Sequence, residues 1–366
     1  MTRPVVLDDI ETPVGYVDLD RVRANARRMA AYATEHGLGW RPHIKTHKST
    51  AIARIQLAAG ARGLSVATLR EAEVMATLTD DLLLAYPPVG RGKLDRLVSL
   101  PSHVDVKVAL DSLAVLQALS ERAAAAGRTV GVLVEADMGL GRVGVQTPEA
   151  AVALAREADR LPGVEYRGVL FYPGHIRMPP AEQAPALGVL AERLARLLGA
   201  LEQAGLPAGI VSGGSTPTLW NSHLVPGLTE IRPGSGIFFD KEALEIGLAS
   251  LDDVAYTVLA TVVSTSVPGR AVVDAGSKSL TKEARGAANF GFLLDHPEVP
   301  LAGLSEEHGV LDGSRSSWVP VIGERVRLVP NHVCVSVNLQ DALLADDGGE
   351  LTLLALEGRG RMPWTG

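Results

Sequence analysis

The stretch Trp40-Arg41-Pro42-His43-Ile44-Lys45-Thr46-His47-Lys48 places four amine or imidazole side chains within six residues. We predict a strand over Gly39–Lys45, in which successive side chains alternate between two faces. Arg41, His43 and Lys45 then share one face. Lys45 comes near the carboxyl end of this strand, where (β/α)8 barrels carry their catalytic residues.

A lysine at this position has two interpretations. It is either part of a solvated basic turn before a helix or an amine held in a closed site. In a closed site burial disfavours the positive charge, and the neutral amine forms a Schiff base with an aldehyde cofactor. The motif alone is compatible with both interpretations, so other parts of the sequence are needed to decide between them.

The composition is that of a globular protein with two domains. The chain has 366 residues, of which 46% are apolar and 21% charged. The net charge is 35 − 42 = −7 without a basic run, which argues against nucleic acid or an anionic membrane as partner. The acidic start, MTRPVVLDDIETP, and the lack of a long apolar window lead us to expect a cytoplasmic protein. The single cysteine, Cys334, excludes an internal disulfide.

A β-then-α rhythm runs through the first two thirds of the chain and predicts a (β/α)8 barrel over residues 16–249. An open doubly wound sheet is the alternative, but the first strand is not followed by a nucleotide-binding fingerprint. The eight predicted strands are Gly39–Lys45, Gly63–Ala67, Leu82–Tyr86, Val104–Ala109, Val130–Glu135, Tyr166–Tyr172, Gly209–Ser212 and Glu230–Ile237.

The pattern changes near Ser250 to short apolar runs separated by Gly, Pro and Asp. We predict a C-terminal, mostly antiparallel β domain over residues 250–366, together with residues 1–15. Its predicted strands are Tyr256–Ser264, Arg270–Asp274, Arg325–Val329 and Leu351–Leu356, and the stretch Lys282–Trp318 is expected to be irregular.

Several predicted strands end in residues suited to a bound cofactor. Arg142 lies in the glycine-rich motif Asp137–Gly144, which is either a binding turn or a surface turn with an Asp–Arg pair. The turns Ser212-Gly213-Gly214-Ser215-Thr216 and Gly234-Ser235 offer backbone N–H groups that suit a phosphate, although Gly/Ser turns are also common elsewhere. Tyr172 ends another strand, and His175 follows it.

A further site is expected at His332 and Cys334. In an extended segment their spacing puts imidazole and thiolate on one face, a pair that suits zinc. Two protein ligands leave positions open for water or substrate. The alternative is a buried thiol beside a histidine that has an ordinary hydrogen bond.

Taken together these motifs resemble the fold-type III pyridoxal phosphate enzymes, and within them the D-threonine aldolase/D-serine dehydratase family. The resemblance covers nearly the whole chain. It implies that Lys45 carries the cofactor and that His43, in the same motif, belongs to the cofactor-binding residues. It also implies that Arg142 faces the phenolic oxygen and Tyr172 the ring nitrogen. The resemblance gives the phosphate to Ser212, Gly213, Gly214, Ser215, Thr216, Gly234 and Ser235.

The metal motif of this family is implied for His332 and Cys334, with zinc expected and manganese or magnesium as alternatives. The aldolases compared have His-x-Asp, whereas the dehydratases have His-x-Cys, as this chain does. Pro173 and Gly174 also stand where those aldolases have a histidine after the tyrosine. Both differences favour a dehydratase.

The resemblance therefore implies a lyase that acts on a small D-β-hydroxy-α-amino acid. A dehydratase releases a 2-oxo acid and ammonia, with Lys45 removing the Cα proton. The alternative is a D-threonine aldolase that releases glycine and an aldehyde, with His175 as a candidate base. An amino-acid racemase and a non-catalytic cofactor carrier are further alternatives. A homodimer is expected by resemblance.

Overall fold

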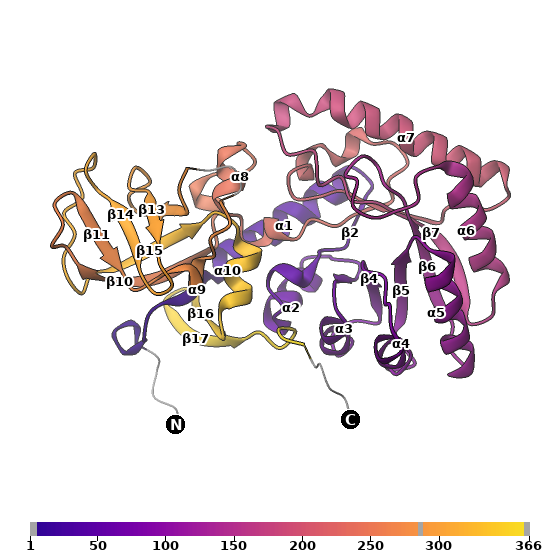
Figure 1. Cartoon of the computed structure of the whole chain (residues 1–366), viewed down its shortest axis with the longest axis horizontal. Coiled ribbons are helices and arrows are strands. Elements are labelled where there is room, and N and C mark those ends of the chain that lie inside the picture. Colours follow the sequence, from indigo (N-terminus) through magenta and orange to yellow (C-terminus); the bar gives the residue numbers. More distant parts are fainter. Residues whose placement is uncertain (1–5, 285–287, 362–366) are drawn as a thin grey trace. The chain divides into compact units, whose positions relative to one another are not determined.

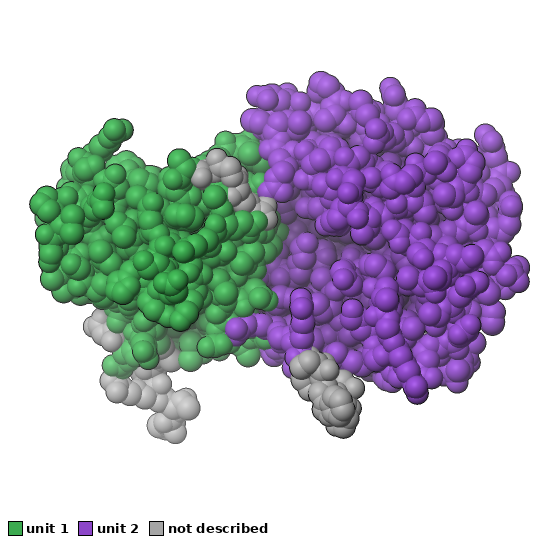
Figure 2. All heavy atoms as spheres, in the orientation of Figure 1, with its two compact units in different colours: residues 1–26, 235–356 green, residues 27–234, 357–366 purple. Residues whose placement is uncertain are grey.

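The computed structural model describes residues 6–284 and 288–361 and forms two compact units (Figure 2). The β unit combines the chain up to Ala26 with Ser235–Leu356. The barrel unit combines Arg27–Gly234 with the described residues from Glu357 onward. The division near residue 235 lies before the predicted boundary at 249/250, which remains a prediction. The ends of the predicted β domain, residues 1–5 and 362–366, lie outside the described residues.

The barrel unit is built on eight parallel strands in sequential order (Figure 1). An isolated parallel bridge between His43 and Ser65, with a hydrogen bond from Ser65 N to Pro42 O (2.9 Å), joins the two ends of the sheet. The predicted (β/α)8 barrel is confirmed. Its strands are β2 (Gly39–Trp40), β3 (Leu64–Val66), β4 (Asp81–Leu84), β5 (Asp105–Leu110), β6 (Val130–Glu135), β7 (Val164–Leu170), β8 (Ile210–Gly213) and β9 (Glu230–Ile231).

Helices cover the outside of these strands (Figure 1). In α6, Thr147 Oγ1 accepts from Ala150 N and Pro148 occupies the first turn, where its missing N–H costs nothing. In α7 the buried leucines recur every three or four residues. The helices are α1 (Leu19–Glu35), which spans the division, α2 (Thr50–Ala58), α3 (Leu69–Met75), α4 (Arg91–Val98), α5 (Leu113–Ala125), α6 (Pro148–Arg160) and α7 (Ala184–Gln203). The 3-10 turns η2 (Ile44–Thr46), η3 (Pro180–Glu182) and η4 (Leu219–Leu224) complete the unit.

Part of the barrel interior is ionic. Arg41, fully buried, donates to Glu230 (3.0 Å) and to Asp81 (2.6 Å), and Lys107 pairs with Asp81 (2.8 Å). A Cβ on Gly63 would lie 2.6 Å from Arg41 Nη1, so a glycine is needed to make room for this guanidinium. These ion pairs connect strands β2, β4, β5 and β9 inside the barrel.

The β unit contains one mostly antiparallel sheet, as predicted. Residues 16–18 fall within the span predicted for the barrel, but as part of strand β1 they pair with β10 and β16 of this sheet. The stretch Lys282–Trp318, expected to be irregular, contains three short strands. The strands are β1 (Val14–Asp18), β10 (Tyr256–Ser264), β11 (Arg270–Val273), β12 (Gly291–Leu293), β13 (Leu301–Leu304), β14 (Gly309–Asp312), β15 (Arg325–Pro330), β16 (Ala342–Asp347) and β17 (Glu350–Ala355).

The helical segments of the β unit are short. They are η1 (Leu7–Asp9), η5 (Ser235–Ile237), α8 (Lys241–Glu245), η6 (Leu251–Asp253), α9 (Ser277–Leu280) and α10 (Val333–Leu339). In the part of the chain that the structure describes, no helix combines the length and apolar character needed to cross a bilayer.

Candidate active site

The lysine motif forms a turn and not the predicted strand. Strand β2 ends at Trp40, and Ile44–Thr46 form the 3-10 turn η2. Pro42 supplies no N–H group to a ladder, so regular pairing stops there. The prediction that Arg41, His43 and Lys45 share a face is wrong beyond this point, because Arg41 and His43 are buried whereas Lys45 is exposed.

The residues after this turn are tied to the far end of the chain. Gly358 N donates to Lys48 O (2.8 Å), and Thr50 N donates to the carboxylate of Glu357 (3.0 Å). Arg70 Nε also donates to Glu357 O (2.9 Å). The segment that follows Lys45 is therefore held by residues from the far end of the sequence, Glu357 lying 307 positions after Thr50.

Three predicted cofactor residues meet around the Tyr172 ring. Lys45 Nζ lies 5.9 Å and Arg142 Cζ 5.0 Å from the ring centroid. Tyr172 is half-buried, and a Cβ on Gly174 would lie 2.2 Å from its ring. The barrel thus brings an amine, a guanidinium and a phenol together at the carboxyl ends of strands far apart in sequence.

The loop that carries Arg142 is held by two carboxylates. Asp137 Oδ1 accepts from the backbone N–H groups of Gly139 (3.0 Å) and Leu140 (2.9 Å). Asp111 accepts from Gly144 N (2.8 Å). Although burial opposes it, these backbone donors lower the pKa of Asp137, so its charge is present at neutral pH.

The two turns predicted to hold phosphate pack together. Gly234 N donates to Thr216 Oγ1 (3.2 Å), and the Ser215 and Thr218 hydroxyls lie 3.0 Å apart. A Cβ on Gly234 would lie 2.9 Å from His43 O and 3.0 Å from Thr46 Oγ1. The lysine turn can approach these residues so closely only because position 234 has no side chain.

The remaining residues of these turns differ in their surroundings. Gly213 is fully enclosed, and Gly214 adopts φ +78°, a conformation that favours glycine. The Ser212 hydroxyl donates to Glu230 Oε1 (2.7 Å) and is engaged in the ionic interior of the barrel. Ser235 is the first residue of this segment in the β unit, where its carbonyl accepts from Phe239 N (2.7 Å).

His43 is a buried, neutral imidazole. Burial, followed by the charges of Lys45 and Arg232, lowers its pKa well below the usual value. Its Nδ1 lies 3.5 Å from Lys45 N. A neutral ring beside the lysine turn adds no further positive charge to the neighbourhood of Lys45.

Sequence reasoning missed Arg232 at the end of β9. Its Nη2 donates to Phe171 O (2.5 Å), and its buried Nε has no hydrogen-bond partner among the described residues. Burial lowers the pKa of Arg232 to about 10, so it stays charged at neutral pH. Glu135, at the end of β6, is a second buried group whose pKa is raised by burial. For Glu135 the available signal was a charged residue at the end of the apolar strand β6, whereas Arg232 follows a two-residue strand that itself contains Glu230.

His175 lies in a turn after β7 and is exposed. It lies close to Gly139, since its Nε2 would be 3.2 Å from a Cβ at that position, next to Arg193 Nη1 at 3.0 Å. Its role as a base stays a prediction.

His332 and Cys334 do not lie in an extended segment as predicted. His332 is the N-cap of α10, and Cys334 is in its first turn. The two side chains nevertheless interact, and Asp240 Oδ2 lies 3.1 Å from His332 Nδ1. Burial alone would lower the pKa of His332, but Cys334 and Asp240 raise it to about 9. No group of three or more His, Cys, Asp or Glu side chains within residues 6–284 and 288–361 is arranged to hold a metal.

Both predicted groups fit the residues present. For pyridoxal phosphate, the exposed Lys45 amine and the Tyr172 ring supply a linkage point and an aromatic contact. Arg232 adds a buried Nε–H that donates to none of the described residues. For a divalent metal, His332 and Cys334 supply two borderline-soft donors, and the other positions are left to water or substrate.

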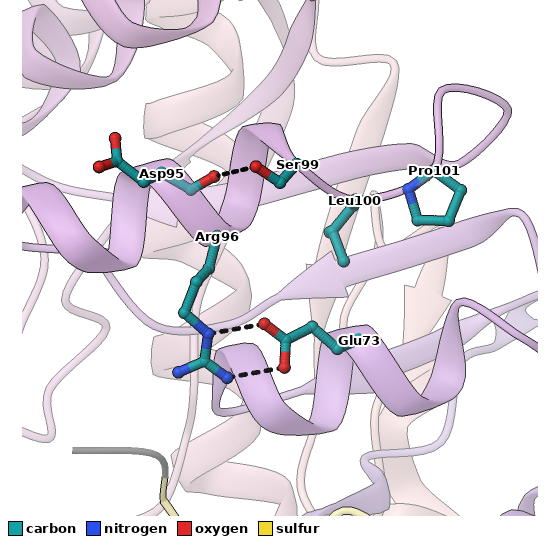
Figure 3. A pocket seen from close by; sticks show the side chains of 6 residues that line it. All are labelled: Glu73, Asp95, Arg96, Ser99, Leu100 and Pro101. Carbon is teal, nitrogen blue, oxygen red and sulfur yellow. Dashed lines mark hydrogen bonds and ion pairs between the residues drawn. The ribbon is translucent and has the colours of Figure 1, made fainter. Parts of the chain in front are cut away.

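A surface hollow of about 240 Å³ lies elsewhere in the barrel unit (Figure 3). Glu73 on α3 pairs with Arg96 on α4 at 2.6 Å, and Ser99, Leu100 and Pro101 lead toward β5. These residues precede the amino end of a barrel strand, the end opposite to that of Lys45 and Tyr172. The hollow is therefore separate from the candidate site.

The sequence matches two family models. Residues 17–242 match "Alanine racemase, N-terminal domain" and residues 255–345 match "Putative serine dehydratase domain". The fold and the two family models define the class of alanine racemase-like barrel enzymes.

Similar proteins and solved structures show which enzymes of this class the chain resembles. D-threo-3-hydroxyaspartate dehydratase from Delftia sp. (strain HT23) is 35% identical, and the match covers 95% of this chain and 98% of that protein. The crystal structure of D-threonine aldolase from Filomicrobium marinum is 31% identical with a TM-score of 0.91, covering 98% of both chains. A C-to-A variant of D-threo-3-hydroxyaspartate dehydratase, solved in its metal-free form, is 32% identical with a TM-score of 0.84, covering 95% and 97%.

The chain belongs to this family of pyridoxal phosphate-dependent lyases with an alanine racemase-like N-terminal domain.

Proposed function

We propose that the protein is a pyridoxal phosphate- and metal-dependent dehydratase of D-β-hydroxy-α-amino acids. The products are a 2-oxo acid and ammonia. The proposal is supported by the 35% identity to a D-threo-3-hydroxyaspartate dehydratase along nearly its whole length. Pyridoxal phosphate, when bound, withdraws electrons from the Cα of an attached amino acid.

Different residues of the barrel unit bind the cofactor and transfer the proton in this proposal. Lys45 holds the cofactor aldehyde and then removes the Cα proton, for which its exposed amine beside Tyr172 is suited. Arg142 offers a permanent charge to the anionic oxygen of the pyridine ring. The turns at Ser215, Thr216 and Gly234 hold the phosphate.

In the β unit, His332 and Cys334 hold a divalent metal, with zinc as the proposed ion. A metal there supplies Lewis acidity toward a β-hydroxyl group. The substrate loses a proton from Cα and its β-hydroxyl, which takes up a proton and leaves as water. Hydrolysis of the resulting enamine consumes one water and releases ammonia and the 2-oxo acid.

The observation that carries the dehydratase is the His332-x-Cys334 spacing, with His332 at the N-cap of α10 and the single cysteine of the sequence in its first turn. Although α10 replaces the expected extended segment, both residues lie at its first turn, which supports the proposal. The metal-free form of a cysteine-to-alanine variant among the relatives belongs to a dehydratase, which supports a metal-binding role for this thiol.

The test is incubation of purified protein with D-threonine, with and without a chelator. We expect 2-oxobutyrate and ammonia, lost on chelation and restored by Zn²⁺. Lys45→Ala should lose both the visible absorbance of the bound cofactor and turnover. Lys93→Ala is the matched control, because Lys93 Nζ lies 5.6 Å from the ring centroid of Tyr86 on the protein surface.

Other products contradict the dehydratase assignment. Acetaldehyde plus glycine would identify an aldolase, and a change in Cα configuration alone would identify a racemase. Coloured protein without any product from D-β-hydroxy amino acids would indicate a cofactor carrier.

We further propose a cytoplasmic homodimer. The proposed dimer is supported by the resemblance to fold-type III enzymes and by a run of exposed apolar side chains between β14 and β15. Val319, Val321 and Ile322 are 78%, 62% and 65% exposed, which is unusual for a surface that faces only water.

A further inference from the structure

Asp240 contacts the proposed metal ligand His332 from a different part of the sequence. Its Oδ2 lies 3.1 Å from His332 Nδ1 and also accepts from Val333 N at 3.0 Å. Its Oδ1 accepts from Ala243 N at 3.2 Å as the N-cap of α8. The Asp240 side chain is only 4% exposed, so water competes little for these contacts.

These contacts determine which ring nitrogen of His332 is available to bind a metal. A carboxylate only accepts hydrogen bonds, so the ring must donate Nδ1–H to Asp240 Oδ2. The lone pair of the neutral ring is then on Nε2. The backbone N–H of Val333 donates to the same oxygen, which prevents Asp240 from rotating away without losing two hydrogen bonds.

The backbone before Asp240 is held in a rarely populated conformation. Phe239 is buried and has φ +51°, a region that non-glycine residues avoid at a cost of about 1 kcal/mol or more. On the other side of the ligand, Asn331 Nδ2 donates to Asn289 O (2.7 Å). His332 is therefore positioned through both its neighbour in sequence and Asp240.

We propose that Asp240 is the positioning residue of the metal site, which holds His332 as the Nδ1-protonated tautomer with Nε2 directed to the metal. Histidine ligands commonly donate their second ring N–H to a carboxylate, and loss of such a partner weakens metal binding. The inference rests on the proposed metal site and extends it to a residue outside the His332–Cys334 motif.

Two substitutions separate this role from helix capping. In Asp240→Asn, an amide that keeps its oxygen toward Ala243 N presents its NH2 group to His332 and favours the wrong tautomer. In Asp240→Ser, the hydroxyl still caps α8 but is too short to reach His332. Asp253→Asn is the control, since Asp253 caps η6 in the same unit through Ser250.

Zn²⁺ affinity of the metal-free protein is measured by competition with a chromophoric chelator. We expect Asp240→Asn and Asp240→Ser to bind about 10- to 100-fold more weakly and Asp253→Asn to bind like the wild type. Circular dichroism and thermal unfolding of the metal-free variants verify the fold. In ¹⁵N-histidine-labelled, zinc-loaded wild type, the His332 signal, assigned with His332→Ala, should show a protonated Nδ1.

The outcomes distinguish the two proposals. If His332→Ala binds Zn²⁺ as well as the wild type, the proposed metal site itself is wrong. If His332→Ala loses Zn²⁺ but both Asp240 variants retain full affinity, the metal site stands and the positioning role is overturned. A His332 signal with the proton on Nε2 in the wild type would also overturn it.

Discussion

Single residues in the lysine motif differ sharply in environment although they are neighbours in sequence. His43 and His47 are buried and Lys45 is exposed. The motif indicated the chemistry but not this arrangement, because strand alternation ends after Pro42. His47 Nε2 lies 3.0 Å from Gln56 Oε1, and its Nδ1 accepts from Ser49 N at 3.2 Å. His47 is thus held as a neutral ring.

This environment makes stability depend on pH. Burial lowers the pKa of His47 to about 4, whereas an unfolded histidine titrates near 6.5. The unfolded state therefore binds more protons between these values. The contribution of His47 is fully present above about pH 6.5 and is lost as the pH falls to about 4, by on the order of 3 kcal/mol.

We expect the melting temperature of the wild type to fall between pH 7.5 and pH 5, and to fall less in His47→Asn. His103→Asn, at an exposed histidine, serves as the control and should behave like the wild type. Equal pH dependence in wild type and His47→Asn would show that His47 does not carry this effect.

At the scale of elements, prediction succeeded where a pattern was long. Val130–Glu135 has the predicted bounds, because a continuous buried run of this length is unambiguous. The alternating valines of Val333–Leu339 suggest a strand, yet α10 forms there. The strands between 291 and 312 span three or four residues each, too few to show a period.

The buried ion pairs inside the barrel are another feature that no local sequence pattern predicts. Glu230→Gln would leave the buried Arg41 with a weakened partner, and we expect a loss of about 3–5 kcal/mol in the free energy of unfolding. Glu165→Gln, which removes the exposed partner of Arg167, should change it by about 1 kcal/mol or less. Urea unfolding followed by circular dichroism measures both, and similar effects in the two variants would contradict the expectation.

At the scale of the whole molecule, each unit is assembled from segments far apart in the sequence. The β unit takes its first strand from the start of the chain, and the barrel unit takes Glu357 and Gly358 from the end. Sequence reasoning found two fold types and assigned residues 1–15 to the β domain, but it did not connect Glu357 and Gly358 with the barrel unit, because no composition change separates them from the strand before them.

The proposed homodimer gives a prediction at this scale. Ile322→Asp places a charge within the exposed apolar run and should shift the protein from dimer to monomer in analytical ultracentrifugation. Val189→Asp, at an isolated exposed valine of α7, should leave the mass unchanged. A wild-type monomer, or a dimer unaffected by Ile322→Asp, would contradict the proposed role of this run.

The hydrogen bonds that join Glu357 and Gly358 to Thr50 and Lys48 also bear on biosynthesis. Glu357 is synthesised 307 residues after Thr50. The segment that follows Lys45 therefore cannot form these hydrogen bonds until Glu357 and Gly358 have left the ribosome. The turn that carries Lys45 therefore gains its neighbours from two stages of synthesis, and a chain cut before Glu357 would lack the hydrogen bonds to Lys48 and Thr50.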